Sequence, residues 1–125
     1  MIAAARFIAV IDKDRDVRKT VRSLLQAHGF RTQAYASAEA FLLRGRTDQP
    51  ACIVLDVDPE GMSGMELLDW LRADAPSVPV VVVTAANDES TRQSVLTAGG
   101  VAYLQKPFSA DLLLAEITKA MTAER

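Results

Sequence analysis

The chain has 125 residues, half of them apolar, which is enough to bury one hydrophobic core of ordinary size. A net charge of −2 at pH 7, with both signs mixed along the chain, argues against a basic stripe for nucleic acid. Cys52 is the only cysteine, so an internal disulfide and a cysteine-based metal cage are excluded. Signal-peptide features and a membrane-spanning run of roughly 20 apolar residues are both missing from the sequence. We therefore expect one soluble, cytoplasmic domain over residues 1–125 that binds neither nucleic acid nor membrane directly.

The first part of the chain alternates strand and helix patterns. RFIAVID (6–12) and RTQAY (31–35) have the composition of short strands. The stretch between them has one apolar helical face and a glycine stop at Gly29; that face consists of Val17, Val21, Leu24 and Leu25. His28 falls at the end of this helix, where it complements the helix dipole. Ser37 is positioned to cap a second helix that runs through Ala40 and Phe41.

The rest of the chain repeats this alternation, with strands predicted at 51–56, 78–84 and 101–105. Three helices are predicted after them. Ser63 and Glu66 have the spacing of a capping box, and either Asn87 or Asp88 can cap a helix that ends at Gly99 and Gly100. Ser109 can cap the last helix, whose inner face contains Leu113, Ile117, Ala120 and Met121.

This alternation predicts an α/β fold. Three of the strands are almost continuously apolar, which is typical of parallel strands covered on both faces. Five strand–helix units with right-handed crossovers favour a doubly wound, flavodoxin-like, three-layer sandwich. We expect a five-stranded parallel sheet of order 2-1-3-4-5, with two helices on one face and three on the other.

Reactive side chains gather at the expected carboxyl ends of the strands. Asp12 and Lys13 follow the first strand, Asp56 ends the third, Thr84 ends the fourth and Lys106 follows the fifth. In doubly wound folds these ends meet in one crevice. A carboxylate there can attack phosphorus, and a hydroxyl and an ammonium beside it can hold the oxygens of the transferred group. Any one of these residues alone is more often a helix cap or a surface side chain.

The chain resembles the receiver domain of response regulators over essentially its whole length. The resemblance rests on VLD with Asp56, MSGMELL (62–68), VVVVTA with Thr84, and AYLQKPF with Tyr103 and Lys106. The sequence around these motifs is similar to that of receivers that precede a DNA-binding helix-turn-helix domain.

The resemblance implies roles for these residues. Asp56 would be the phosphoacceptor, Thr84 and Lys106 would bind phosphoryl oxygens, and Tyr103 would be the aromatic switch. The Lys106–Pro107 bond would be cis. Such a domain takes a phosphoryl group from a histidine kinase or phosphotransfer protein with Mg²⁺ bound. It then signals to an output protein or effector domain through its fourth helix, fifth strand and fifth helix.

The chain departs from this family at the expected metal site. Receivers normally have two adjacent acids after the first strand, whereas here Asp12 is followed by Lys13. Asp12 and Asp56 are balanced by Lys13 and Lys106 without any metal, and Asp58 adds a negative charge if it points inward. A lysine supplies no oxygen ligand and repels Mg²⁺. We expect a weak or lost Mg²⁺ site at Asp12, Asp56 and Asp58; in the alternative, Lys13 extends into water and the ion still binds.

Three other functions fit parts of the pattern. The first is a pseudo-receiver, a docking module of the same fold that works without phosphorylation. The second is a phosphatase of the haloacid-dehalogenase type with Asp58 as general acid, but Pro59-Glu60 and the lack of an acidic pair after Lys106 argue against it. The third is a flavin module, which would need a phosphate-cradling loop after the first strand.

Two large apolar residues are expected at the surface. Leu112 shares the side of the last helix with Glu116 and Lys119, which makes it a candidate contact for a partner or for a second copy in a homodimer. Trp70 lies near a helix edge and is expected to be partly exposed. The role that we expect for this chain, that of a receiver, is not that of an enzyme.

Overall fold

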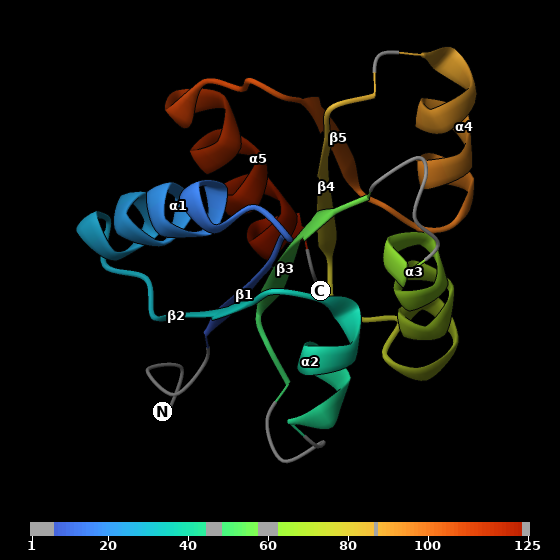
Figure 1. The fold of residues 1–125 in the computed structure, drawn as a ribbon, viewed down its shortest axis with the longest axis horizontal. Helices are drawn as coiled ribbons and strands as arrows, with labels where there is room; N and C mark the ends of the chain where they lie inside the picture. The colour runs from blue at the N-terminus through green and yellow to red at the C-terminus, as the bar shows by residue number, and fades with distance from the viewer. Residues whose placement is uncertain (1–6, 45–48, 58–62, 87, 124–125) are drawn as a thin grey trace.

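The computed structural model describes residues 7–44, 49–57, 63–86 and 88–123. The strands are β1 (Ile8–Ile11), β2 (Thr32–Tyr35), β3 (Cys52–Asp56), β4 (Val80–Thr84) and β5 (Ala102–Gln105). The helices are α1 (Arg15–Ala27), α2 (Ala38–Leu43), α3 (Ser63–Asp74), α4 (Glu89–Thr97) and α5 (Ala110–Ala123). Strands and helices alternate along the chain, as the sequence predicts (Figure 1).

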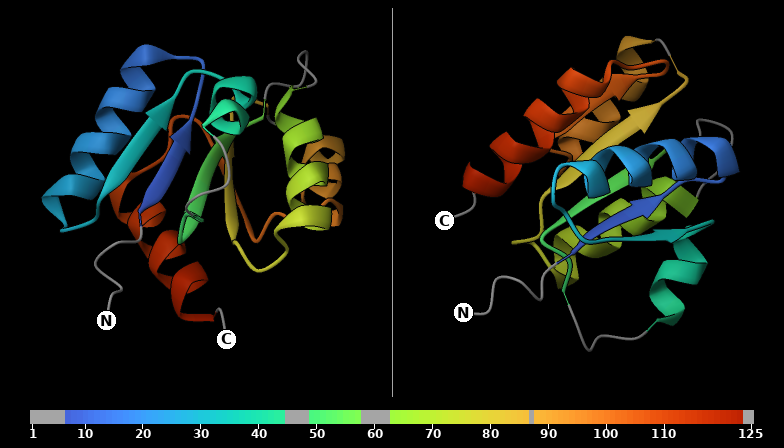
Figure 2. Two further views of the ribbon diagram at one scale, coloured as in Figure 1. Left: turned by 90° about the horizontal axis from the view of Figure 1, so that it is seen from below. Right: turned by 90° about the vertical axis from the view of Figure 1, so that its left-hand side faces the viewer.

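The five strands form one parallel sheet of order β2-β1-β3-β4-β5, which confirms the predicted fold. Helices α1 and α5 lie on one face, and α2, α3 and α4 lie on the other (Figures 1 and 2). The strands are slightly shorter than predicted. For example, β4 begins at Val80, because Pro79 has no N–H with which to extend the ladder.

A separate hydrophobic cluster fills each side of the sheet, because the central strands are apolar on both faces. On the α1/α5 side the cluster includes Val10, Val21, Leu25, Val54, Val83, Leu113 and Ile117. On the other side it includes Ala9, Phe41, Ile53, Leu55, Leu67, Leu71, Val82 and Val95. The two clusters hold the sheet between the helical layers, and the polar residues at its carboxyl end are positioned by that packing.

Side chains cap the helices largely as predicted. The oxygens of Ser37, Asp88 and Ser109 accept hydrogen bonds from main-chain N–H groups of α2, α4 and α5. Asn87, the alternative cap of α4, and the side chain of Ser63 lie outside the described residues, so the capping box at Ser63 stays a prediction. Among the described helices, none combines the length and apolar character needed to cross a bilayer.

Candidate functional site

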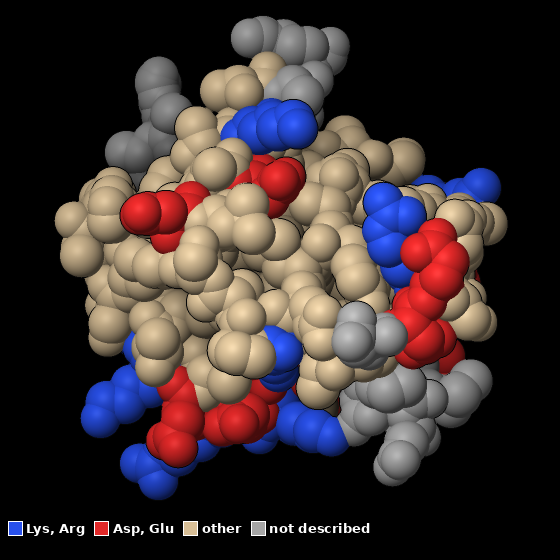
Figure 3. Space-filling view, turned by 90° about the horizontal axis from the view of Figure 1, so that it is seen from above, with Lys and Arg blue, Asp and Glu red and all other residues tan. Residues whose placement is uncertain are grey.

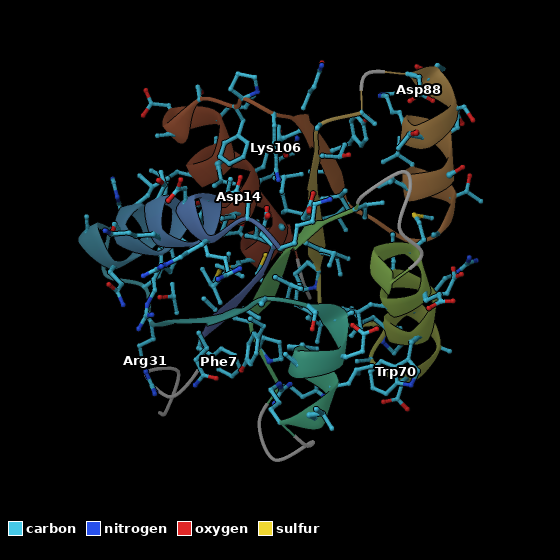
Figure 4. The ribbon with its side chains drawn as sticks, in the orientation of Figure 1. Phe7, Asp14, Arg31, Trp70, Asp88 and Lys106 are labelled. Carbon is cyan, nitrogen blue, oxygen red and sulfur yellow. The ribbon has the colours of Figure 1, made fainter. Side chains whose placement is uncertain are left out.

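Three charged side chains meet at the carboxyl end of the sheet. The Nζ atom of Lys106 lies 2.8 Å from Oδ2 of Asp12 and 3.3 Å from Oδ1 of Asp56. The side chains of Asp12 and Asp56 are 2% and 8% exposed, and that of Lys106 is 19% exposed. One ammonium thus bridges two nearly buried carboxylates, in the crevice where the sequence places them. Figure 4 labels Lys106 and also Asp14, the residue that precedes α1.

The surroundings shift the proton affinities of two of these groups. Burial, followed by the negative charge of Asp12, raises the pKa of Asp56 above its ordinary value of 3.8; Lys106 and, more weakly, Lys13 act in the opposite direction. Burial lowers the pKa of Lys106, but its hydrogen bonds and its attraction to Asp12 and Asp56 outweigh that effect. The pKa of Lys106 therefore lies above its ordinary value of 10.5, and Lys106 is fully charged at neutral pH.

The loop between β1 and α1 is held by several hydrogen bonds around Asp12. Oδ1 of Asp12 accepts from the N–H of Asp14 at 2.8 Å, and its main-chain N–H donates to the carbonyl of Tyr35. Nη1 of Arg18, on α1, donates to the carbonyl oxygen of Asp12 at 2.7 Å. The carboxylate of Asp14 caps α1 by accepting from the N–H groups of Asp16 and Val17. Both carboxylate oxygens of Asp12 are thus engaged, one by main chain and one by Lys106.

Thr84 and Tyr103 are connected through Ala86. The hydroxyl of Thr84, which is fully buried, donates to the carbonyl of Val57 at 2.7 Å and accepts from the N–H of Ala86 at 3.1 Å. The hydroxyl of Tyr103 donates to the carbonyl of Ala86 at 3.1 Å. Burial, and then the charge of Asp88, raises the pKa of Tyr103 above 10.0, so its hydroxyl keeps its proton. The loop after β4 is therefore tied both to β3 and to β5.

Helix α3 begins in close contact with the end of β3. A Cβ atom added at Gly64 would lie 2.8 Å from the carbonyl oxygen of Asp56 and 3.1 Å from Cα of Val57. Such distances are too short for any side chain, and main-chain atoms cannot move aside as a flexible side chain would. Glycine at this position lets the first turn of α3 approach the strand that presents Asp56.

The described residues do not by themselves form a site suited to Mg²⁺. Asp12 and Asp56 contribute carboxylates, but they already bind the ammonium of Lys106. Within the described residues there is no group of three or more acidic, histidine or cysteine side chains placed to hold a metal ion, whereas Mg²⁺ takes near-octahedral oxygen ligation. Asp58, the third ligand expected from the sequence, lies outside the described residues. Lys13 is exposed, and its charge acts on Asp56.

The structure also describes the other features singled out in the sequence. Leu112 on α5 is 46% exposed and Trp70 on α3 is 38% exposed, as expected. Trp70 lies near the far end of α3, remote from Lys106 (Figure 4). His28 ends α1, and its Nδ1 atom lies 3.0 Å from the carbonyl oxygen of Leu24. The Lys106–Pro107 bond is cis, as the family resemblance implied.

Sequence reasoning missed three features of the site. Asp14 has a recognisable signal, since an acid just before an amphipathic helix is a common cap. Arg18 had a weaker signal, because it lies one turn beyond that cap on the side of α1 that faces the strand ends. The acceptor of the Thr84 hydroxyl, the carbonyl of Val57, has none, because every residue has a carbonyl.

On the face drawn in Figure 3, acidic and basic side chains lie beside one another around a largely uncharged centre. The described residues on this face therefore form no continuous positive stripe of the kind that attracts nucleic acid.

Comparison with known proteins identifies relatives of this chain. Residues 8–118 match the family model described as the response regulator receiver domain. The chain is 37% identical over 111 residues to the response regulator MprA of Mycobacterium leprae, covering 88% of this chain and 48% of that protein. It is 33% identical over 114 residues to the transcriptional regulatory protein FixJ of Azorhizobium caulinodans, covering 91% and 54%. The chain therefore spans about half the length of these two relatives.

A solved structure shows the same fold. The CheY-like receiver domain protein from Methanospirillum hungatei superposes with a TM-score of 0.87 over 95% of both chains, at 23% identity. At this level of identity the similarity concerns the arrangement of strands and helices.

Proposed function

This chain belongs to the family of response regulator receiver domains of two-component systems, and we propose that Asp56 is its phosphoacceptor. The phosphoryl donor is a histidine kinase or a phosphotransfer protein. One carboxylate oxygen of Asp56 forms a bond to phosphorus while the bond from phosphorus to the donor's imidazole nitrogen breaks, and its electron pair stays with the donor. The domain is a signalling module, and the acyl phosphate on Asp56 is the signal.

The observation that carries this proposal is the position of Lys106 between Asp12 and Asp56. Its ammonium is 3.3 Å from Oδ1 of Asp56, so it is placed to pair with oxygens of a phosphoryl group attached there. Thr84 takes part only after a change of partner, since its hydroxyl now donates to the carbonyl of Val57. In our proposal that hydroxyl rotates toward a phosphoryl oxygen. Tyr103 responds to this rotation because the hydroxyls of Thr84 and Tyr103 are both hydrogen-bonded to Ala86.

We further propose that Lys13 replaces the divalent cation in balancing the pocket. Lys13 and Lys106 together offset the charges of Asp12 and Asp56, and the influence of Lys13 on the pKa of Asp56 has the required sign. A monovalent ammonium reduces repulsion between carboxylates but cannot bridge an attacking and a transferred oxygen as a metal ion does. Phosphorylation of this chain is therefore expected to be slow.

The proposed output surface consists of α4, β5 and α5, with Tyr103 within it and Leu112 at its edge. The exposure of Leu112, at 46%, supports this assignment. The partner is an effector domain or output protein, DNA-binding in the full-length form, or a second copy of the chain. Residues 1–125 act as one receiver domain, and the cytoplasm is the proposed site of action.

A second candidate function is that of a pseudo-receiver, which docks partners without phosphorylation. Two observations favour it: the lysine at position 13, and the hydroxyl of Thr84, which is held by Val57 rather than directed at Asp56. A phosphatase function of the haloacid-dehalogenase type would depend on Asp58 as general acid and is the weakest of the alternatives.

Mass spectrometry of the intact chain, incubated with a small acyl phosphate with and without Mg²⁺, distinguishes these functions. The native chain and Asp58→Asn should gain one phosphoryl group slowly, and Asp56→Asn should gain none. Label that persists in Asp56→Asn would refute the assignment of Asp56. A native chain that stays unlabelled under both conditions would favour the pseudo-receiver.

A further inference from the structure

Helix α4 is held to the rest of the domain by few buried side chains. Within α4, Val95 is the buried residue, and Ala98 just beyond its end is buried as well. Leu96 is 37% exposed, and the rest of the helix is polar. A helix with so little buried apolar surface has low local stability, so single contacts at its ends weigh heavily in its position.

Arg72 of α3 makes such a contact at the C-terminal end of α4. Its Nη1 atom donates to the carbonyl oxygen of Thr97, the last residue of α4, at 3.1 Å. Carbonyls in the last turn of a helix have no intrahelical donor, and this end of the dipole attracts positive charge. The last turn of α4 has no basic residue of its own, so Arg72 supplies from another helix the charge that α4 lacks.

The aliphatic part of Arg72 also lies near the turn that follows α4. Gly99 has a φ of +109°, and a Cβ atom added to it would lie 3.7–3.9 Å from the Cβ, Cγ and Cδ atoms of Arg72. A cavity of 100 Å³ lies beside this contact, lined by residues that include Leu71, Ala98 and Gly99. Apolar packing between α3 and the end of α4 is therefore incomplete, and the side chain of Arg72 connects the two helices.

The opposite end of α4 adjoins the residues of the candidate site. Asp88 caps the helix, and the preceding loop is tied to Tyr103 and Thr84 through Ala86. Helix α4 is thus held at both ends, by the site at its N-terminus and by Arg72 at its C-terminus. Figure 1 shows α3 and α4 as neighbours in the layer that covers this face of the sheet.

We propose that Arg72 is a positioning residue that fixes the C-terminal end of α4 and so restrains the rearrangement of the α4–β5–α5 surface. While Arg72 holds Thr97, a change at Thr84 and Tyr103 moves only the beginning of α4. Release of the contact frees the whole helix. The restraint itself exists in the unmodified chain; its role in signalling rests on the function proposed for Asp56.

Amide hydrogen exchange of the unphosphorylated chain tests the restraint directly. In Arg72→Ala, amides 94–100 should exchange about three- to tenfold faster, since a lost hydrogen bond changes an opening equilibrium by roughly that factor. Arg72→Lys, which keeps the charge but not the planar fork, should have an intermediate effect. Arg92→Ala, which removes an exposed arginine of α4 paired with Glu89, should leave these amides unchanged.

The pattern of exchange decides the outcome. Acceleration confined to α4 and the following turn supports the proposal. Unchanged exchange at 94–100, or equal acceleration in α1, overturns it, because the first means no restraint and the second means general destabilisation. No phosphodonor is used, so the result stands whether or not Asp56 is a phosphoacceptor. With a phosphodonor, Arg72→Ala should be labelled faster than the native chain if the restraint opposes signalling; an equal rate would remove that role.

Discussion

The ammonium of Lys106 is hydrogen-bonded to the carboxylate of Asp12 at 2.8 Å, although 94 residues separate them in the chain. Asp12 follows β1 and Lys106 follows β5, so this ion pair passes over the ends of the two intervening strands β3 and β4. It closes the crevice above Asp56 and determines how the site responds to substitution and to pH.

Removal of Lys106 should destabilise the chain at neutral pH. Lys106→Met leaves two nearly buried carboxylates near each other, with only the weaker influence of Lys13 on Asp56 to offset their charge. Breaking a fully buried pair costs roughly 3–5 kcal/mol, and about 2 kcal/mol is expected here because Lys106 keeps some contact with water. Urea unfolding at pH 7 and pH 5 measures this loss, which should be smaller at pH 5, where a carboxylate can take up a proton. Lys119→Met, at an exposed position of α5, is the control.

Asp56→Asn should stabilise the chain at pH 7. The pKa of Asp56 is raised by burial and by Asp12, so its folded state binds a proton more readily than its unfolded state. Its ionised form therefore costs stability at neutral pH, and this cost disappears as the pH falls through the folded pKa. Thermal unfolding of both chains between pH 7 and pH 4 should show a difference in Tm that narrows toward acid. A difference that widens toward acid would contradict the raised pKa.

Thr84→Val should cost about 2 kcal/mol in the free energy of unfolding, measured with urea. Valine has nearly the same shape, but it leaves the carbonyl of Val57 and the N–H of Ala86 without the partner they have in the native chain. Buried groups left unpaired cost about 1–3 kcal/mol each. Thr84→Ser keeps both hydrogen bonds and should cost less. A loss in Thr84→Ser as large as that in Thr84→Val would contradict this prediction, because serine lacks only the methyl group and keeps the hydroxyl.

Lys13→Asp should create measurable Mg²⁺ binding. The variant adds a carboxylate beside Asp12 and removes a positive charge that repels the ion. NMR chemical shifts in an Mg²⁺ titration are the suitable measurement, because Trp70 lies far from the site and its fluorescence would respond weakly. Lys13→Ala separates the loss of repulsion from the gain of a ligand. Strong Mg²⁺ binding by the native chain would show that Lys13 does not replace the ion.

Leu112→Ser should weaken self-association or partner binding without unfolding the domain, since Leu112 is 46% exposed. Leu113→Ala, one residue further along α5, should instead lower stability by about 2–5 kcal/mol, because Leu113 is fully buried in the core. Sedimentation velocity and thermal unfolding of the pair separate the two effects. An exposed substitution on α1, such as Arg22→Ser, should affect neither; an effect equal to that of Leu112→Ser would argue against the α4–β5–α5 surface.

The sheet was predictable because its signals are local and repeated. Uninterrupted apolar segments such as those at β3 and β4 identify parallel strands, and the caps at Ser37, Asp88 and Ser109 identify helix beginnings. The meeting of Asp12, Asp56 and Lys106 followed from the topology, since all three come at strand ends.

The hydrogen-bonding state of the site was not predictable. Whether the hydroxyl of Thr84 faces Asp56 or Val57 depends on a rotamer, and either acceptor is compatible with the same sequence. The contact of Arg72 with Thr97 depends on how closely α3 and α4 pack, which no spacing within either helix specifies. The contribution of Lys13 is likewise a matter of side-chain direction, and it stays a prediction.

The contact at Gly64 has a mechanical consequence. Gly64 itself has no side chain that could change rotamer and absorb a shift, and the atoms nearest to a Cβ added there are main-chain atoms of Asp56 and Val57. A movement of the Asp56 carbonyl is therefore transmitted directly to α3, whereas a contact made of long, flexible side chains would absorb part of the movement. The start of α3 therefore moves together with the end of β3. A substitution at Gly64 would change this coupling without altering any charge of the site.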